Sequence, residues 1–461
     1  MFWTMVKREF LDGVVSLRFL VTSVLAISVM ATGAVLFVGD YAERLGDYNR
    51  KFNQNLEKIR GSTEDLGKLA TTQQSLYKRP STLSFCASGG EESLPNAISV
   101  DVSSTSSEHN VARRNPTLSD FTKLDWTFIV GVIFSFMALL LSYDGISGER
   151  EMGTLRLTLS NPVPRVKVML AKFCGIMMTV CIPLMIGLLV YLLIVVASGK
   201  VPLGGGDWAR IGIMVLVSLV YVGSFVALGL LVSARTSSSS TSLVVLLFIW
   251  VVSAIVIPSS SGLIASGFYK LPSLTEVEQR ASTRADAITE EYKGKNVVMN
   301  RGNPKAKSNK TWMEWQNAMQ QARMDVYREF QRRQFNQTRL ARNIAKLSPR
   351  AVYTYIMEAL AETGFERHIR FLEDAERYRE QLARFVREKD QQDPDSAHLY
   401  FVDWGLSKRP VDFEEVPVFR ESSPSLGESL RQALPDLGIL FLFGVAFFMG
   451  ALASFIRCDV A

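Results

Sequence analysis

The stretch FCGIMMTVCIPLMIGLLVYLLIVVA, residues 173–197, decides the fold class of this chain. It is an unbroken apolar run, and a helix of about 20 such residues spans the hydrocarbon core of a bilayer. Five other runs of about 18 to 25 residues have the same character. They are Phe19–Val38, Trp126–Tyr143, Ile211–Val232, Leu243–Ile264 and Leu437–Ile456. We therefore predict an all-α polytopic membrane protein with six transmembrane helices.

The overall composition agrees with this assignment. The 461 residues are 48% hydrophobic with a mean hydropathy of +0.14, and polar segments separate the apolar runs. A secretory signal would have a shorter apolar region ending at a small-residue cleavage site. We therefore expect residues 1–18 to form an uncleaved amphipathic helix on the membrane surface, followed by span 19–38. Pro258 and serines 259–261 interrupt the fifth run, so that helix is expected to kink or end early.

Positive charges in the short loops predict the orientation, because Lys and Arg are enriched on the cytoplasmic side. They precede the first span, occupy loop 144–172, and follow the fourth and sixth spans at Arg235 and Arg457. These regions all fall on one side if the spans alternate. We therefore expect both termini to be cytoplasmic.

Two long segments, 39–125 and 265–435, would then lie outside the membrane. In the first, Tyr48–Leu76 has a polar helical pattern and Ser84–Ser107 is loop-like. The second is mostly charged helix with apolar residues at three- and four-residue steps, which is typical of a helical hairpin or small bundle. The sequence therefore predicts an α-helical extracytoplasmic domain.

Charge is unevenly distributed in the second segment. From Lys293 to Arg350 there are fourteen Lys and Arg residues against three acidic ones, a net of +11, whereas residues 351–395 are slightly acidic. Two hypotheses remain open. The two stretches pair through opposite charges, or the basic stretch meets anionic lipid headgroups or an acidic protein outside the membrane.

The sequence offers little for chemistry. The four cysteines and three histidines are scattered, and no CxxC pair or phosphate-binding loop is present. We expect no catalytic, cofactor-binding or metal-binding residue in this chain and no nucleic-acid partner. The span interiors contain no Asp, Glu, Lys, Arg or His, which argues against an ion-coupled transporter. Energy for transport would have to come from a separate protein.

The segment between the second and third spans is the most distinctive motif. After Asp144 it reads Gly148-Glu149-Arg150-Glu151-Met-Gly153-Thr154-Leu155, then Leu159-Ser160-Asn-Pro162, with Arg165 and Lys172 beyond. This closely resembles the corresponding loop of type-2 ABC exporter permeases. In that family the loop is a short helix that docks on a separate ATPase subunit. The resemblance therefore implies an ATPase-coupling role for Asp144, Gly148, Glu149, Arg150, Glu151, Gly153, Thr154, Leu155 and Arg165.

Other parts of the chain extend the resemblance. Lys7, Arg8 and Glu9 look like the family's interfacial elbow helix, which would be residues 1–18. Ser81–Phe85 with Leu94 and Pro95, and Leu347–Arg350 with Glu358–Leu360, are similar to a subgroup with large outer domains. The family implies a place in the bacterial inner membrane and a second permease, identical or homologous. It also implies that the partner ATPase, not this chain, binds ATP and Mg.

The residues of the loop favour docking without the family. Glu149, Arg150 and Glu151 offer charge-assisted contacts to a partner, and Gly148 and Gly153 permit close approach. The alternative is an ordinary charged loop whose positive residues only fix the topology.

Small residues form a row in the sixth span. Ala446, Gly450 and Ser454 recur at four-residue steps, a spacing that lets helices pack closely within a protomer or across a dimer.

Three functions are compatible with these features. The leading one is ATP-driven export of a lipid-like or amphiphilic substrate, since the spans lack charge. The second keeps the ATPase but transmits mechanical force to an extracytoplasmic partner without moving a solute. The third is a membrane anchor or receptor whose helical outer domain carries the function.

Overall fold

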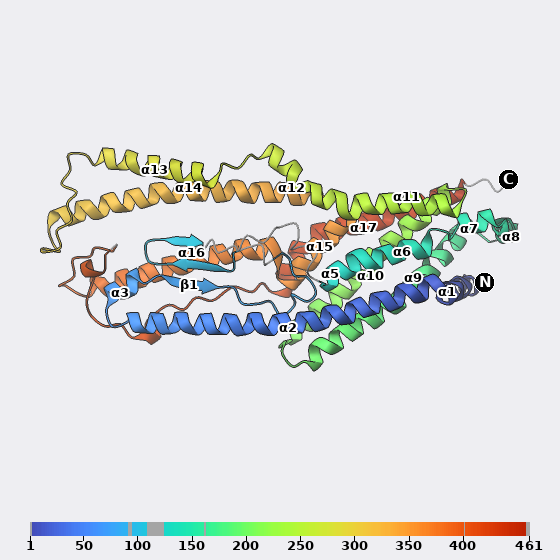
Figure 1. The fold of residues 1–461 in the computed structure, drawn as a ribbon, viewed down its shortest axis with the longest axis horizontal. Helices are drawn as coiled ribbons and strands as arrows, with labels where there is room; N and C mark the ends of the chain where they lie inside the picture. Colours follow the sequence, from blue (N-terminus) through green and yellow to red (C-terminus); the bar gives the residue numbers. More distant parts are fainter. Residues whose placement is uncertain (1, 91–94, 108–123, 161–162, 401, 458–461) are drawn as a thin grey trace.

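The computed structural model describes residues 2–90, 95–107, 124–160, 163–400 and 402–457. The molecule is elongated, with a bundle of apolar helices and both ends of the chain on one side and a hydrophilic domain on the other (Figure 1). Leu94 and Pro162, which belong to the sequence motifs above, lie outside the described residues.

Within the described residues, six helical segments are long and apolar enough to cross a membrane. In chain order they are α2 (Leu17–Ser62), α5–η2–α6 (Trp126–Phe128, Ile129–Phe134, Ser135–Ser142), α9 (Arg165–Ala197), α10 (Gly205–Arg235), α11–η3–α12 (Ser239–Val251, Val252–Val256, Ile257–Phe268) and α17 (Leu426–Ile456). Each contains one of the predicted spans, so the prediction of an all-α protein with six transmembrane helices is confirmed.

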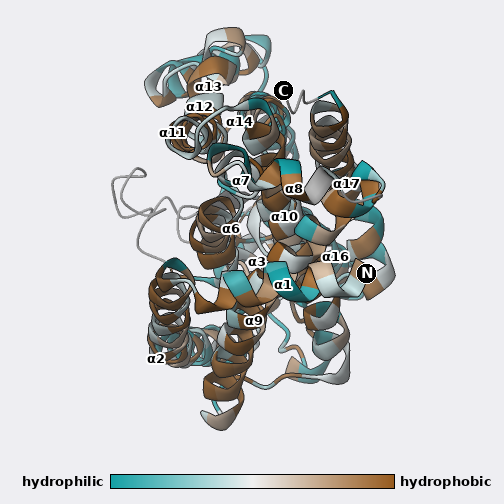
Figure 2. Cartoon of the chain, turned by 90° about the vertical axis from the view of Figure 1, so that its right-hand side faces the viewer, coloured by the Kyte–Doolittle hydropathy of each residue, from teal (hydrophilic) through white to brown (hydrophobic). Residues whose placement is uncertain are grey.

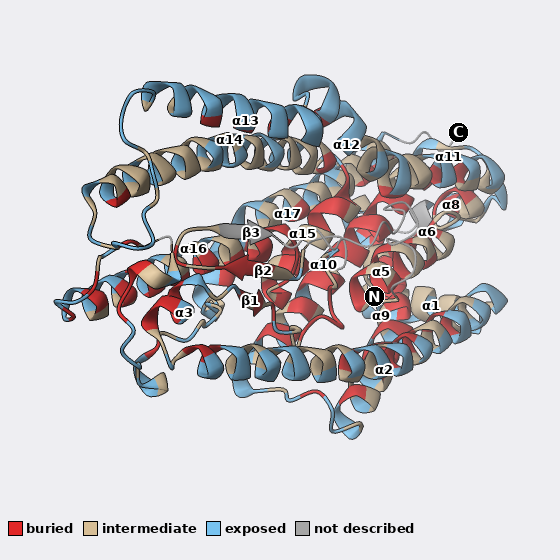
Figure 3. Ribbon diagram, turned by 60° about the vertical axis from the view of Figure 1, so that its left-hand side comes forward, coloured by how far each residue is buried: buried red, intermediate tan, exposed pale blue. Residues whose placement is uncertain are grey.

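Helix α10 lies at the centre of the bundle. It packs against α6, α9 and α17, and 72% of its most apolar 18-residue stretch is buried (Figure 3). In α11–η3–α12 and in α17, only 17% of the corresponding stretch is buried. These two segments carry large exposed apolar side chains such as Phe248 and Phe441. Figure 2 shows much of the helical bundle in brown, the colour of hydrophobic residues. Such faces are stable where lipid or another apolar surface covers them.

The fifth span does not end early. It continues through Pro258 to Phe268, and its irregularity is instead a π-helical stretch, η3, directly before the proline. Pro258 has no N–H to donate to the carbonyl four residues earlier, that of Ala254. The second span contains a π-helical stretch as well, η2. No residue of Ile129–Phe134 indicates this second stretch.

The first hydrophilic segment differs in part from its prediction. The helical pattern assigned to Tyr48–Leu76 ends at Ser62, and Asp65 then caps a short helix α3 (Leu66–Thr71). Three strands follow in an antiparallel sheet of order β1–β2–β3. They are β1 (Gln74–Tyr77), β2 (Ala97–Val100) and β3 (Thr105–Ser107). The loop-like stretch therefore contributes two short strands, because Ile98 and Val100 alternate with Ser99 and bury their side chains.

The second hydrophilic segment is helical, as predicted. It contains α13 (Leu274–Glu291), α14 (Lys307–Ala345), α15 (Pro349–Ala361) and α16 (Gly364–Gln391), followed by turns η4 (Asp403–Gly405) and η5 (Phe413–Glu415). Helices α13 and α14 form an antiparallel hairpin, whereas α16 lies on the sheet and on α3 (Figure 1). Phe371 and Tyr378 of α16 share an apolar core with Ile98 and Val100.

Helix α15 belongs by sequence to the hydrophilic segment but packs into the bundle. Val352, Tyr353, Ile356 and Leu360 are fully buried and share the main apolar core with the spans. Arg210 at the start of α10 holds the far end of α15 through a hydrogen bond to the Leu360 carbonyl (2.9 Å). The hydrophilic domain is therefore joined to the bundle through packed helices.

Opposite charges join the basic and acidic helices at two places. Arg328 of α14 lies 3.1 Å from Glu376 of α16, and Arg342 lies 2.8 Å from Glu358 of α15. Many basic side chains on α14 remain exposed, among them Arg323, Arg332 and Arg339. Charge pairing between the two stretches thus accounts for part of the basic excess.

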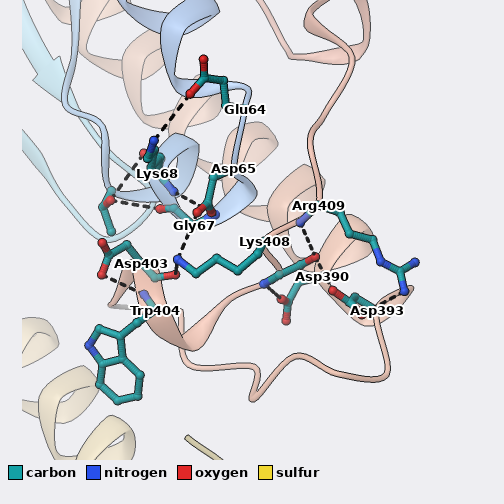
Figure 4. Close-up of polar contacts among 12 residues, drawn as sticks. Glu64, Asp65, Gly67, Lys68, Asp390, Asp393, Asp403, Trp404, Lys408 and Arg409 are labelled. Atoms are coloured by element: carbon teal, nitrogen blue, oxygen red, sulfur yellow. Dashed lines mark hydrogen bonds and ion pairs between the residues drawn. The ribbon is translucent and has the colours of Figure 1, made fainter. Parts of the chain in front are cut away.

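A polar cluster ties the far end of the domain together (Figure 4). Lys408 Nζ lies 3.0 Å from an Asp65 carboxylate oxygen and donates to the Asp403 carbonyl at 3.1 Å. The backbone at Gly67 is so close to Asp403 that a Cβ would lie 2.1 Å from its carbonyl oxygen. Asp390 is fully buried and accepts the Ser407 backbone N–H at 2.8 Å. These contacts hold the segment after α16 against α3.

Candidate functional site

Two short helices form the loop that the sequence singles out. They are α7 (Ser147–Glu151) and α8 (Thr154–Ser160), and they lie at the end of the molecule that carries both termini (Figure 1). The Ser233 hydroxyl of α10 accepts the backbone N–H groups of Ile146 and Ser147 at 3.0 and 2.9 Å, so it caps the start of α7. Gly153 joins the helices with a φ of +73°, a conformation that favours glycine.

The three charged residues of α7 bind within the chain. Arg150 donates to the carbonyls of Thr236 (2.8 Å) and Ala234 (3.2 Å) at the end of α10. A Glu151 carboxylate oxygen accepts the backbone N–H (3.1 Å) and the hydroxyl (3.0 Å) of Ser239, where α11 begins. Glu149 binds Lys172. These contacts fix α7 against the spans, and a role for the same side chains in binding a partner stays a prediction.

Lys172 is the centre of a buried ionic cluster. Its Nζ atom lies 2.7 Å from Glu149 Oε1 and 2.7 Å from Glu9 Oε1, and its side chain is only 3% exposed. We call Lys172, Glu9 and Glu149 the Lys172 triad. The triad joins α7, α9 and the N-terminal helix α1 (Phe2–Val15) at one point. The sequence placed Lys172 in the positive loop and in the motif but did not predict this role, because the contact depends on the packing of three separate helices.

The other predicted coupling residues surround the triad. Asp144 lies 2.9 Å from Arg18 of α2. Arg165 donates to the Phe455 and Ile456 carbonyls at the end of α17, at 3.1 and 2.5 Å. The remaining ones are close to α7 itself: the Thr154 hydroxyl donates to the Glu149 carbonyl (3.3 Å), Leu155 is buried, and a Cβ at Gly148 would lie 3.3 Å from the Asp144 Cβ. Loop 144–172 is therefore attached to α2, α9, α10, α11 and α17, which are five of the six spanning segments, and it continues directly from the remaining one.

Helix α1 lies across α9 where two glycines allow close approach. A Cβ on Gly175 of α9 would lie 2.6 Å from the Glu9 Cβ, and one on Gly13 would lie 2.8 Å from the Thr179 hydroxyl. Lys7 and Arg8 point into solvent, whereas Glu9 turns inward to the triad. Trp3 and Val15 expose apolar surface, as expected for a helix lying on a membrane.

The outer surface of α7 and α8 is partly apolar. The side chains of Met152 and Leu157 are 72% and 70% exposed, and the nearby Arg156 and Glu151 are exposed as well. Sequence reasoning missed both apolar residues, since single Met and Leu residues next to a membrane span look like ordinary packing positions. We call these four residues the α7–α8 surface.

The small-residue row of α17 packs partly within the chain. A Cβ on Gly450 would lie 3.2 Å from Leu231 of α10, and Ser454 accepts a hydrogen bond from Arg235 Nε at 3.0 Å. Ala446 is exposed. Two of the three residues thus serve contacts inside one protomer.

Six helical segments long and apolar enough to cross a membrane define an integral membrane protein. Residues 3–460 match the family described as "ABC-2 family transporter protein", and the chain therefore belongs to that family. It is also similar to the "Probable ABC transporter permease protein NosY" of Stutzerimonas stutzeri, with 33% identity over 125 residues. That match covers 27% of this chain and 44% of the relative, so it spans less than half of the relative's length.

Proposed function

We propose that this protein is the permease subunit of an ABC transporter in the bacterial inner membrane. It exports a lipid-like or amphiphilic compound. A separate cytoplasmic ATPase, which binds ATP and Mg, drives the export. Two permeases, identical or homologous, would pair with two such ATPases. The ATPase would dock on the α7–α8 surface, on the same side as both termini. The hydrophilic domain would then lie outside the cytoplasm.

The Lys172 triad is the observation that carries this proposal. A partner that displaces α7 must also move α9 and α1, because a buried ammonium and two carboxylates bind all three helices. The Lys172 side chain is only 3% exposed and those of Glu9 and Glu149 are 24% and 21% exposed, so separating these ion pairs would leave a buried charge and is unfavourable. A surface loop that only fixed topology would need no such link to the spans.

Co-purification with the ATPase tests the docking surface. Met152→Asp with Leu157→Asp should abolish recovery of the ATPase with the tagged permease, because two exposed apolar contacts become charged. Glu149→Ala with Glu151→Ala should leave ATPase turnover uncoupled from the permease. The matched control is Leu274→Asp with Val298→Asp, two exposed apolar positions in the hydrophilic domain. Equal ATPase recovery from the α7–α8 variant and the control would refute docking at this surface.

Export itself needs a transport measurement. The complete complex in proteoliposomes should move a fluorescently labelled phospholipid between leaflets only when ATP and Mg are present. A complex that hydrolyses ATP but moves no amphiphile would favour the second candidate.

The second candidate is force transmission to an extracytoplasmic partner, and two features favour it. Helix α2 runs without a break from the bundle into the hydrophilic domain over 46 residues, and α15 of the domain is buried among the spans. Both would carry a displacement of the bundle outward.

A Gly46→Pro substitution in α2 separates the candidates. Proline interrupts the helix without changing its number of residues, and no atom outside this part of the helix lies within 4 Å of a Cβ built at this position. Force transmission predicts that nucleotide-dependent changes in the hydrophilic domain are lost while ATP turnover persists. Export predicts unchanged phospholipid movement in the same variant.

A further inference from the structure

A polar contact region lies where the two π-helical stretches meet α15. Arg350, the second residue of α15, donates from Nη1 to the Ala254 carbonyl in η3 at 2.6 Å. Its guanidinium also lies 5.8 Å from the centre of the Phe128 ring, directly before η2. One side chain of the hydrophilic segment therefore contacts both irregular spans.

Arg350 binds the Ala254 carbonyl, to which Pro258 cannot donate a hydrogen bond. Because proline has no N–H, the Ala254 carbonyl lacks its usual donor four residues later. A polar backbone group without a partner is costly inside an apolar bundle, so a donor must be supplied from elsewhere. Arg350 supplies it, which ties the irregularity of the fifth span to the hydrophilic domain.

The second span is held by a matching set of side chains. The Gly131 carbonyl in η2 accepts the hydroxyl of Tyr221 at 2.7 Å and that of Ser135 at 2.8 Å. Trp250, two residues before η3, donates from Nε1 to the same Ser135 hydroxyl at 2.9 Å. Spans two and five are thus linked to each other directly as well as through Arg350.

Close packing completes the region. A Cβ on Gly131 would lie 3.6 Å from Arg350 Cγ and 3.9 Å from the Tyr353 ring, so α15 lies close against η2 at this point. The Tyr353 ring stacks on Tyr221 of α10 with centroids 4.3 Å apart. The Tyr353 hydroxyl lies 2.9 Å from that of Ser218. The central helix of the bundle therefore shares this region with α15.

The second span connects this region to the α7–α8 loop through α6 and a turn, residues 143–146, that leads directly into α7. π-Helical turns often occur at functional sites, because one extra residue per turn can be passed along the helix. A charged side chain among membrane helices is likewise a functional candidate. Both signals coincide at Arg350.

We propose that Arg350 is a positioning residue that holds η2 and η3 in one arrangement and passes the movement of α7 to the hydrophilic domain. This inference rests on the proposed function, since it needs an ATPase that moves α7. Displacement of the second span would shift η2, and Arg350 would move α15 with it. Loss of the guanidinium should leave ATP turnover in place and disconnect the domain.

The experiment uses the complete permease–ATPase complex in lipid nanodiscs. Amide hydrogen exchange is compared between the nucleotide-free state and the state trapped with ATP and vanadate, and ATP turnover is measured in parallel. The variants are Arg350→Gln, Arg350→Lys and Trp250→Phe. The control is Arg323→Gln, which removes an exposed arginine from α14.

In the wild type and in Arg323→Gln, trapping should change exchange in α15 and α16. In Arg350→Gln the change should shrink roughly fivefold while ATP turnover stays within about twofold of wild type, as expected for a residue on a coupling route. Arg350→Lys keeps one donor for the Ala254 carbonyl and should restore part of the response. Trp250→Phe weakens the direct link between spans two and five and should reduce the response, which tests the inference even if Arg350→Gln does not fold.

Two results would overturn the inference. In one, Arg350→Gln and Trp250→Phe respond like Arg323→Gln. In the other, the wild type hydrolyses ATP but trapping leaves exchange in α15 and α16 unchanged. The failure of the proposed function looks different, because in that case no ATPase co-purifies and the wild-type complex shows no ATP turnover at all.

Discussion

The Lys172 ammonium is shared between two carboxylates on helices that are far apart in sequence. The three charges sum to −1 in a region almost closed to water. Without the ammonium, the Glu9 and Glu149 carboxylates would be left buried and mutually repulsive. The triad therefore stabilises the junction only when all three members are present.

Lys172→Met should lower the free energy of unfolding by roughly 3–5 kcal/mol, because it leaves two partly buried carboxylates close together without their counter-ion. Thermal unfolding of the purified permease in detergent would measure the loss. Lys7→Met, at an exposed position, serves as control. Adding Glu9→Gln and Glu149→Gln to Lys172→Met should recover much of the stability. Similar unfolding temperatures for Lys172→Met and Lys7→Met would contradict the prediction.

His368 predicts an effect of pH on the hydrophilic domain. Burial lowers the pKa of His368 from 6.5 to about 3, and the Lys78 ammonium, 3.0 Å from its Nδ1, adds to this. The unfolded chain therefore binds a proton that the folded chain does not, and stability falls as pH drops from 6.5 towards 3. The slope should be at most about 1.4 kcal/mol per pH unit from this residue.

The measurement is thermal unfolding of the full-length protein across this pH range, with wild type and His368→Gln compared. Glutamine keeps a hydrogen-bonding side chain but cannot titrate. The variant should show a flatter pH dependence than wild type. Parallel curves for the two proteins would rule out His368 as the source.

At the scale of elements, the contact between α1 and α9 depends on the absence of a side chain. Gly175→Ala would place a methyl group 2.6 Å from the Glu9 Cβ and push the two helices apart. We expect a destabilisation of about 1–3 kcal/mol and faster amide exchange in α1. Gly39→Ala in α2 is the matched control, because nothing lies within 4 Å of its Cβ. Unchanged exchange in α1 would show that the helices adjust without separating.

The sequence predicted those elements whose pattern is long and local. The six apolar runs and the charged helices α13, α14 and α16 all follow from periodicity alone. The three short strands did not, because Gln74–Tyr77 continues a helical pattern and pairs with residues 20 to 26 positions away. The π-helical stretch η2 was equally hidden, since Ile129–Phe134 is an ordinary apolar sequence.

The candidate site was predicted as a list of residues but not as an arrangement. The motif identified α7 and α8, yet Arg150 and Glu151 bind α10 and α11 of the same chain. The Lys172 triad and Arg350 depend on contacts between segments that sequence spacing cannot place together. Arg350 was also assigned to a hydrophilic segment, so its position among the spans could not be foreseen.

For the whole molecule, the positive-inside pattern predicts that the two ends of the structure lie on opposite sides of the membrane. In a background with the four native cysteines replaced by serine, Lys310→Cys should react with a membrane-impermeant maleimide in intact spheroplasts. Arg8→Cys should react only after the membrane is opened. Both positions are exposed, so accessibility within the protein does not limit labelling. Labelling of Arg8→Cys in sealed spheroplasts would show that the protein has the opposite orientation in the membrane.

The unbroken course of α2 also limits how this protein can change in length. Successive residues of an α-helix are turned by about 100°, so one inserted residue rotates everything beyond it by that angle. Gly33 packs in the bundle at one part of α2, and Ile59 packs in the hydrophilic domain near its end. The rotation of Ile59 relative to Gly33 about the axis of α2 is therefore fixed. Family members that keep both contacts should differ in this helix by about seven or eleven residues, the steps that nearly complete whole turns.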